Sequence, residues 1–168
     1  MASLFAKKPV KSIAPDGYER FLAIAAGALL LVVIVALAKG QAQWRIVPPL
    51  VWAHLSTITV ALVLTPYMLW QPRGTKIHRQ LGKVWVVAMI ATAAISLFVH
   101  HSSTQRFSVI HLLSLFTLVM APRVWLTARR HNVAGHRATV RGLVTGALVV
   151  AGYFTLLETR MLGSWLFR

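Results

Sequence analysis

The feature that most constrains the fold is an apolar run without a single polar side chain, from Phe21 to Ala38. As a helix with a rise of about 1.5 Å per residue, this run has the length that crosses the hydrocarbon layer of a bilayer. A cleavable signal peptide is the alternative interpretation, because Ala36-Leu37-Ala38 resembles a cleavage site. The run is long for the apolar core of a signal peptide, which favours a retained membrane helix.

Four further apolar stretches follow, over residues 48–70, 80–100, 107–128 and 137–159. Only 12% of the residues are charged, against about a quarter in a soluble domain, so lipid must take the place of water as the solvent. The sequence therefore predicts an all-α integral membrane protein with five transmembrane helices. Its parts are a basic cytoplasmic tail over 1–20, a first transmembrane helix over 21–38 and a four-helix membrane bundle over 48–160.

The basic residues predict the orientation of the chain in the membrane. Thirteen Lys and Arg residues fall in the tail and in the regions 71–83 and 123–141, whereas the opposite side carries five. The positive-inside rule then places the N-terminus in the cytoplasm and the C-terminus in the periplasm of a bacterial inner membrane. The net charge of +15 suits anionic lipid headgroups rather than nucleic acid, because the basic residues lie between apolar runs.

Two parts of the chain, 48–100 and 107–159, have similar sequences. Each contains a histidine, an apolar span, a proline, a basic turn and a second histidine followed by arginine: His54, Pro66 and His78-Arg79 in the first, His111, Pro122 and His136-Arg137 in the second. The two histidines are 24 residues apart in the first part and 25 in the second. This pattern predicts two parallel helical hairpins related by a pseudo-two-fold axis along the membrane normal. His54 would then face His111 near the outer side, and His78 would face His136 near the inner side.

Two imidazoles from facing helices inside an apolar cavity suit the axial positions of a haem iron. We therefore expect one or two haem b groups, held by the pair His54 and His111 and by the pair His78 and His136; the outer pair is preferred if only one haem is present. Basic side chains near both pairs are available to bind the haem propionates. They are Lys76, Arg79, Lys83, Arg137 and Arg141 at the inner side, and Arg45 and Arg106 at the outer side.

The segments His54-Leu-Ser…His78-Arg79-Gln-Leu-Gly82 and His111…Gly135-His136-Arg137 resemble a family of small predicted bacterial multi-pass membrane proteins of unknown function. This resemblance covers residues 48–160. One histidine on each of four consecutive helices also resembles the arrangement in transmembrane dihaem cytochromes b that pass electrons from ascorbate. The second resemblance implies haem b and electron transfer across the membrane, from a quinol or another donor to an acceptor on the opposite side.

Each of these histidines also has a purely structural interpretation, because a membrane histidine can bond neighbouring helices or cap a helix. The alternative function is therefore a cofactor-free accessory or structural subunit of a larger respiratory or photosynthetic membrane complex. A carrier of protons or small molecules is less favoured, since the sequence shows neither broken helices nor buried acids. The absence of cysteine excludes thiolate metal sites and iron–sulfur clusters, and no hydrolytic signature is present.

Three further expectations concern polar residues near the ends of the spans. We interpret His100 and His101 as interfacial and His131 as solvated in a cytoplasmic turn. Glu158 is interpreted as the only acid near a span, and it either pairs with Arg106 or faces water.

Overall fold

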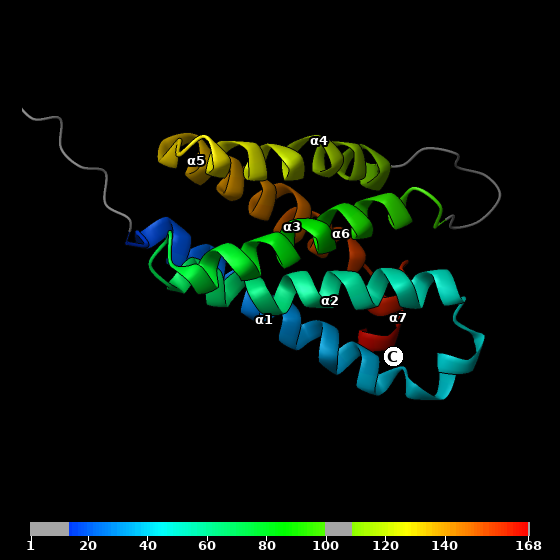
Figure 1. Cartoon of the computed structure of the whole chain (residues 1–168). Helices are drawn as coiled ribbons and strands as arrows, with labels where there is room; N and C mark the ends of the chain where they lie inside the picture. The colour runs from blue at the N-terminus through cyan, green and yellow to red at the C-terminus, as the bar shows by residue number, and fades with distance from the viewer. Residues whose placement is uncertain (1–13, 100–108, 168) are drawn as a thin grey trace, which may run out of the picture.

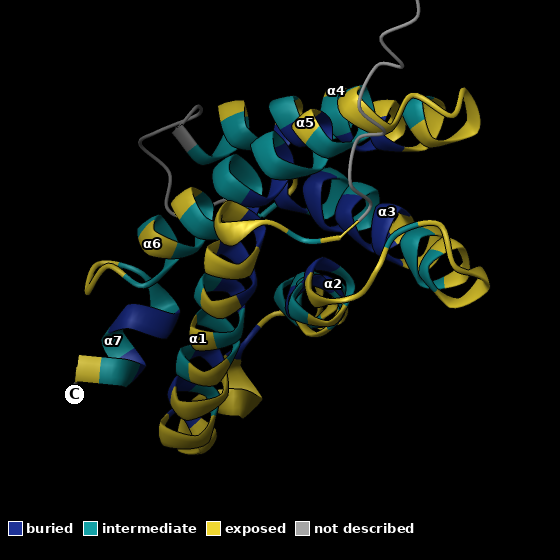
Figure 2. Ribbon diagram, turned by 90° about the vertical axis from the view of Figure 1, so that its left-hand side faces the viewer, coloured by how far each residue is buried: buried dark blue, intermediate teal, exposed yellow. Residues whose placement is uncertain are grey.

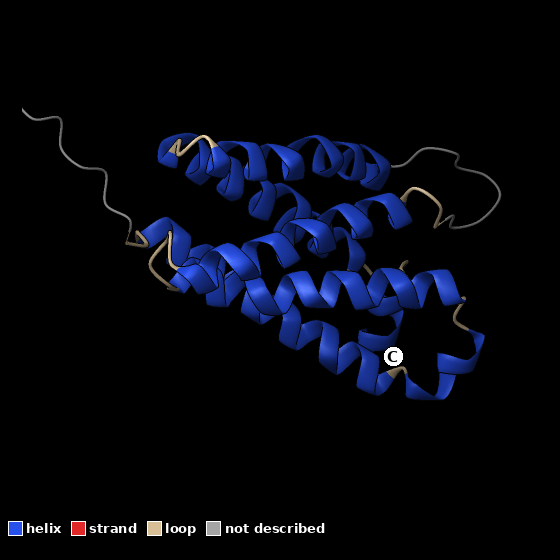
Figure 3. Ribbon diagram, in the orientation of Figure 1, coloured by secondary structure: helices blue, strands red, loops and turns tan. Residues whose placement is uncertain are grey.

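The computed structural model describes residues 14–99 and 109–167, and within this part of the chain every regular element is helical (Figure 3). Four long helices come first: α1 (Gly17–Lys39), α2 (Pro49–Trp70), α3 (Lys76–Ser96) and α4 (Val109–Arg129). The fifth long element, which we call the last span, runs from Val133 to Thr155. It consists of α5 (Val133–Leu143), the π-helical segment η2 (Val144–Val150) and α6 (Ala151–Thr155). Two short helices complete the set, the 3-10 helix η1 (Gln41–Ile46) and α7 (Met161–Phe167).

The five long elements run up and down through one bundle (Figure 1). Each packs against the next in the chain, and η2 of the last span returns to contact α1. The helix α1 is thus a full member of the bundle, in addition to the four helices expected over 48–160. The start of α1, the α2–α3 turn and the α4–α5 turn share one end, which we call the inner end; it lies at the left in Figure 1.

The outward surface of the bundle is apolar, as a lipid environment requires. Large apolar side chains are exposed on every long element, and the burial pattern in Figure 2 shows exposed and intermediate residues around a buried centre. Within the described residues, four elements are long and apolar enough to cross a membrane: α1, α2, α4 from Ile110, and the last span. The chain is therefore an all-α protein with the properties of a multi-pass membrane protein. The helix α3 is of similar length, but its first two turns carry Lys76, Arg79 and Lys83.

Capping residues explain why three helices begin before their apolar runs. Asp16 and Glu19 form a capping box at α1, in which each side chain accepts a hydrogen bond from the other residue's backbone N–H. The Thr75 hydroxyl accepts from the backbone of His78 at α3, and the Asn132 side chain accepts from Gly135 at α5. These caps stabilise first turns that are too polar for hydropathy to identify them as parts of membrane helices. Each of the three helices therefore starts four residues earlier than predicted from hydropathy.

At the outer end, α7 packs against the end of α1. The Trp165 ring covers Gly40 so closely that a Cβ atom there would overlap the ring, and the indole N–H donates to the Gln43 side chain at 2.8 Å. The Lys39 ammonium group also donates to the Leu166 carbonyl. Trp85 is buried in α3 and donates to the Thr65 hydroxyl at 2.8 Å. Trp85 and Trp165 thus pack inside the protein instead of at the membrane surface.

The predictions made for His100, His101 and Arg106 lie outside the described residues. His131 is exposed in the α4–α5 turn, with a positive φ of 52°.

Candidate functional site

A cavity of about 610 Å³ opens inside the inner end of the bundle. Its walls come from the end of α2, from α3, from the end of α4 and from the last span. The deeper wall is apolar and includes Trp85, Val86 and Val144, whereas basic side chains gather toward the helix ends. A volume between about 300 and 1,000 Å³ with an apolar wall and a few polar groups is typical of small-molecule and cofactor sites. We call it the inner cavity.

His78 of α3 and His136 of α5 both line the inner cavity. Their ring centroids lie 6.4 Å apart, with an angle of 74° between the ring planes. The two residues stand in the first turns of their helices, which begin at Lys76 and Val133. The inner histidines of the two sequence segments are therefore neighbours in the structure.

The hydrogen bonds of the two imidazoles show which nitrogen atoms are bonded to the protein and which are available to a ligand. The His136 Nδ1 atom lies 3.1 Å from the Val124 carbonyl oxygen, and because a carbonyl can only accept, Nδ1 carries the proton. The Nε2 atom of neutral His136 is then an acceptor or a metal ligand. The His78 Nδ1 atom is buried and has no hydrogen-bond partner among the described residues. The His136 ring is thus oriented by a backbone carbonyl, as metal-binding histidines commonly are. The His78 ring has a nitrogen atom that is available to a ligand.

A cluster of ion pairs ties α1 to the wall of the inner cavity. The Glu19 side chain is 1% exposed and accepts from Arg137 at 2.8 Å and from Arg141 at 3.2 Å. It also pairs with Arg73 from the α2–α3 turn. The exposed Asp16 carboxylate pairs with Arg137 at 3.0 Å and with Arg141. We call these five residues the Glu19 cluster.

The Glu19 cluster corrects the interpretation of the acidic residues. Glu19 belongs to α1 and not to a solvated tail, so Glu158 is not the only acid near a span. The backbone N–H of Glu19 and the guanidinium group of Arg141 lower the pKa of the Asp16 carboxyl below its ordinary value. The sequence signal for this cluster was the capping-box pattern Asp16-Gly-Tyr-Glu19, which places both acids at a helix start.

Among the described residues, Arg79, Lys83 and Arg129 of the inner cavity have no carboxylate partner. The chain has three acids, all within the described residues. Asp16 and Glu19 are occupied by the Glu19 cluster, and Glu158 is exposed beyond the end of the last span. Arg137, which is predicted to bind a cofactor carboxylate, is bonded to Glu19 through two of its nitrogen atoms.

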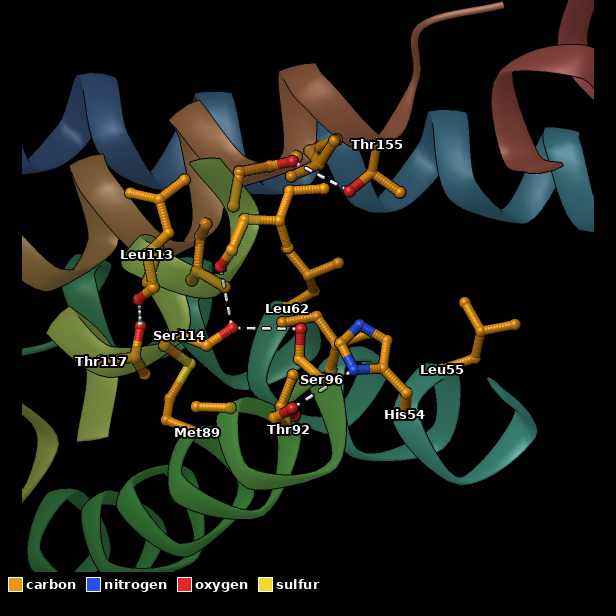
Figure 4. A pocket seen from close by; sticks show the side chains of 18 of the residues that line it. His54, Leu55, Leu62, Met89, Thr92, Ser96, Leu113, Ser114, Thr117 and Thr155 are labelled. Carbon is orange, nitrogen blue, oxygen red and sulfur yellow. Dashed lines mark hydrogen bonds between the residues drawn. The ribbon is translucent and has the colours of Figure 1, made fainter. Parts of the chain in front are cut away.

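The outer histidines have different surroundings. His54 lines a second, smaller cavity of about 120 Å³ near the outer end, which we call the outer cavity (Figure 4). Its Nδ1 atom lies 3.3 Å from the Thr92 carbonyl oxygen. His111 is half-buried on α4 and is not one of the described residues that form the wall of this cavity.

Comparison of the chain with protein-family models, with curated proteins and with solved structures gives no match. The two resemblances based on the histidine segments therefore stay predictions.

Proposed function

We propose that the protein is a b-type membrane cytochrome that binds one haem in the inner cavity, between His78 and His136. The observation that carries this proposal is the separation of 6.4 Å between the two ring centroids on the wall of one cavity. Two imidazoles on opposite sides of one metal ion, each with its nitrogen about 2 Å away, have ring centres about 6 Å apart. The separation of the rings therefore suits a shared iron atom.

The donor set favours haem over a metal ion bound by side chains alone. No group of three His, Cys, Asp or Glu side chains gathers anywhere in 14–99 or 109–167. Two imidazoles provide only half of the four ligands that a tetrahedral metal site needs. A porphyrin supplies the remaining ligands itself, so two histidines are sufficient for it.

The charges of the inner cavity also suit haem. Its apolar wall can hold the porphyrin ring, and its cations Arg79, Lys83 and Arg129 have no carboxylate partner in the part of the chain that the structure describes. Carboxylates form strong charge-assisted hydrogen bonds with such side chains, so these three residues are our candidates for the propionates. Haem b, when bound, supplies a one-electron redox couple. The residues of the chain would hold the cofactor and orient it through the His136–Val124 hydrogen bond, and Trp85, Val86 and Val144 would give the porphyrin ring apolar contacts.

This proposal favours the inner pair, whereas the sequence favoured the outer pair for a single haem. The outer cavity has about a fifth of the volume of the inner cavity. His54 contributes to its wall without His111. The sequence predicts one or two haem groups, and a single inner haem agrees with the smaller of these two numbers.

The purified protein in mild detergent tests this function by its dithionite-reduced minus oxidised visible spectrum. We expect the α and β bands of haem b and a ratio of one haem per chain. A featureless spectrum after expression with ample haem would contradict the proposal. It would favour the alternative, a cofactor-free accessory subunit of a larger respiratory or photosynthetic complex.

We further propose that α3 is the fifth transmembrane helix and that the inner end faces the cytoplasm. The helix has 21 residues, about 30 Å at the helical rise, and it lies between α2 and α4 within the bundle. Its basic first turns stand at the same end as Arg73, Arg129 and Arg130, as the positive-inside rule requires for a cytoplasmic end.

Single-cysteine variants test this topology without background labelling, because the chain has no cysteine. We expect Phe98→Cys, just after α3, to react with a membrane-impermeant maleimide added to intact spheroplasts. Gln71→Cys, in the exposed turn before α3, is expected to react only after lysis. Ala42→Cys in η1 is the control for the outer side. Reaction of both Gln71→Cys and Phe98→Cys from the same side would show that α3 does not cross.

A further inference from the structure

The outer cavity is lined by polar side chains from four elements that converge within an apolar bundle (Figure 4). The polar residues of its wall are His54, Thr92, Ser96, Ser114, Thr117 and Thr155. None of the described residues that line it is Asp, Glu, Lys or Arg. A charged ligand would therefore have no counterion here, which restricts the ligand to a neutral molecule.

The hydroxyl protons on the α4 side and on the last span are already committed. Thr117 donates to the Leu113 carbonyl at 2.7 Å, and Thr155 donates to the Ala151 carbonyl at 2.9 Å. Ser114 hydrogen-bonds to the Ile110 carbonyl at 2.9 Å and to the Ser96 hydroxyl at 3.1 Å. Ser114 is the donor in both contacts, so its single proton is shared between the Ile110 carbonyl and the Ser96 hydroxyl.

The α2–α3 side of the outer cavity has the same property. The Thr92 hydroxyl donates to the Thr57 hydroxyl at 2.8 Å, and Thr57 donates to the His54 carbonyl at 3.0 Å. His54 Nδ1 must be protonated, because its partner is the Thr92 carbonyl (Figure 4). The Nε2 atom of neutral His54 is therefore an acceptor, and no hydrogen bond among the described residues involves it. Apart from Ser96, every polar side chain of the wall thus offers lone pairs and has its own proton bonded to another group.

We infer that the outer cavity binds a small neutral molecule that carries an N–H or O–H donor, with His54 Nε2 as the principal acceptor. Its volume of about 120 Å³ equals the share of about four water molecules in the liquid. An engineered cavity of about 150 Å³ accommodates benzene, so a five-membered ring is a suitable size here. This site is separate from the inner cavity and does not depend on haem.

Pyrrole and furan form a matched pair of probes, since the two rings are similar in size and only pyrrole has an N–H donor. The protein in lipid nanodiscs is titrated with each probe, and the free concentration is corrected with empty nanodiscs. The labelled methyl group of Met89, in the wall of the outer cavity, reports binding by NMR. Met68 lines the inner cavity, so its methyl group is the internal control. We expect pyrrole to bind roughly five- to tenfold more tightly than furan, the value of one net hydrogen bond.

His54→Phe is expected to reduce the affinity for pyrrole to that for furan, because it keeps a ring and removes Nε2. Thr155→Val, which keeps the shape of the side chain, is expected to reduce the preference for pyrrole in part and provides a second measurement if His54→Phe does not fold. Ser56→Ala is the matched control, since the Ser56 hydroxyl donates to its own helix at 2.8 Å on the exposed face of α2. Equal affinities for the two probes in the wild-type protein would overturn the inference. A Met89 resonance that neither probe moves would also overturn it and indicate a cavity that takes water only.

Discussion

Replacement of Glu19 by glutamine is expected to destabilise the protein more than any other single substitution in the Glu19 cluster. Glutamine preserves the shape of the side chain but removes the charge that Arg73, Arg137 and Arg141 share. Loss of one partner from a buried ion pair costs about 3–5 kcal/mol, because the remaining charge stays desolvated. Since native proteins are stable by about 5–15 kcal/mol, we expect a large fall in Tm. Thermal unfolding followed by circular dichroism in detergent measures this effect.

Two matched variants make this prediction specific. Glu158→Gln removes an exposed carboxylate, and we expect a change within about 0.5 kcal/mol. Asp16→Asn removes the exposed acid of the Glu19 cluster and is expected to have an intermediate effect. The lowered pKa of Asp16 means that its contribution is present above the ordinary pKa of an aspartate and is lost as the pH falls through the lowered value. An unchanged Tm for Glu19→Gln would show that other anions, such as lipid headgroups, balance the three arginines.

Replacement of His78 or of His136 by alanine is expected to abolish the spectrum of a six-coordinate haem. Each substitution removes one of the two imidazoles whose centroids are 6.4 Å apart. Removal of a group that hydrogen-bonds to a metal ligand weakens metal binding by about 10- to 100-fold. Removal of the ligand itself should weaken haem binding by at least the same factor. The reduced-minus-oxidised spectrum and the haem-to-protein ratio of the purified variants measure the effect.

The controls for this prediction are the other histidines. His54→Ala and His111→Ala are expected to retain the full spectrum, because the proposed haem lies in the inner cavity. Loss of the haem bands in His54→Ala or His111→Ala, with normal spectra for His78→Ala and His136→Ala, would move the haem to the outer pair.

Hydropathy was sufficient to identify the long helices but not to place their inner ends. The segments Lys76 to Arg79 and Val133 to His136 lie outside the apolar stretches of the sequence, and the caps Thr75 and Asn132 extend the helices through them. The same effect concealed Glu19, which precedes the apolar run of α1 but lies inside the helix. Its three arginine partners come from segments distant in sequence, so no local pattern indicated which of them it would bind.

The sequence repeat correctly suggested that His78 and His136 are neighbours, because both begin helices that rise from the same end of the bundle. The size of each cavity depends on side chains from four elements, and hydropathy contains no information about it. The sequence therefore did not indicate that the cavity beside His78 and His136 is larger than the cavity beside His54, and the prediction favoured the outer histidine pair.

Electron paramagnetic resonance of the oxidised, haem-loaded protein tests most directly whether His78 and His136 share one iron. We predict a single low-spin ferric species with two imidazole ligands in the wild-type protein. His78→Ala and His136→Ala are predicted to convert any remaining haem to a high-spin species. A high-spin signal in the wild-type protein, or a low-spin signal that survives both substitutions, would contradict the proposed site.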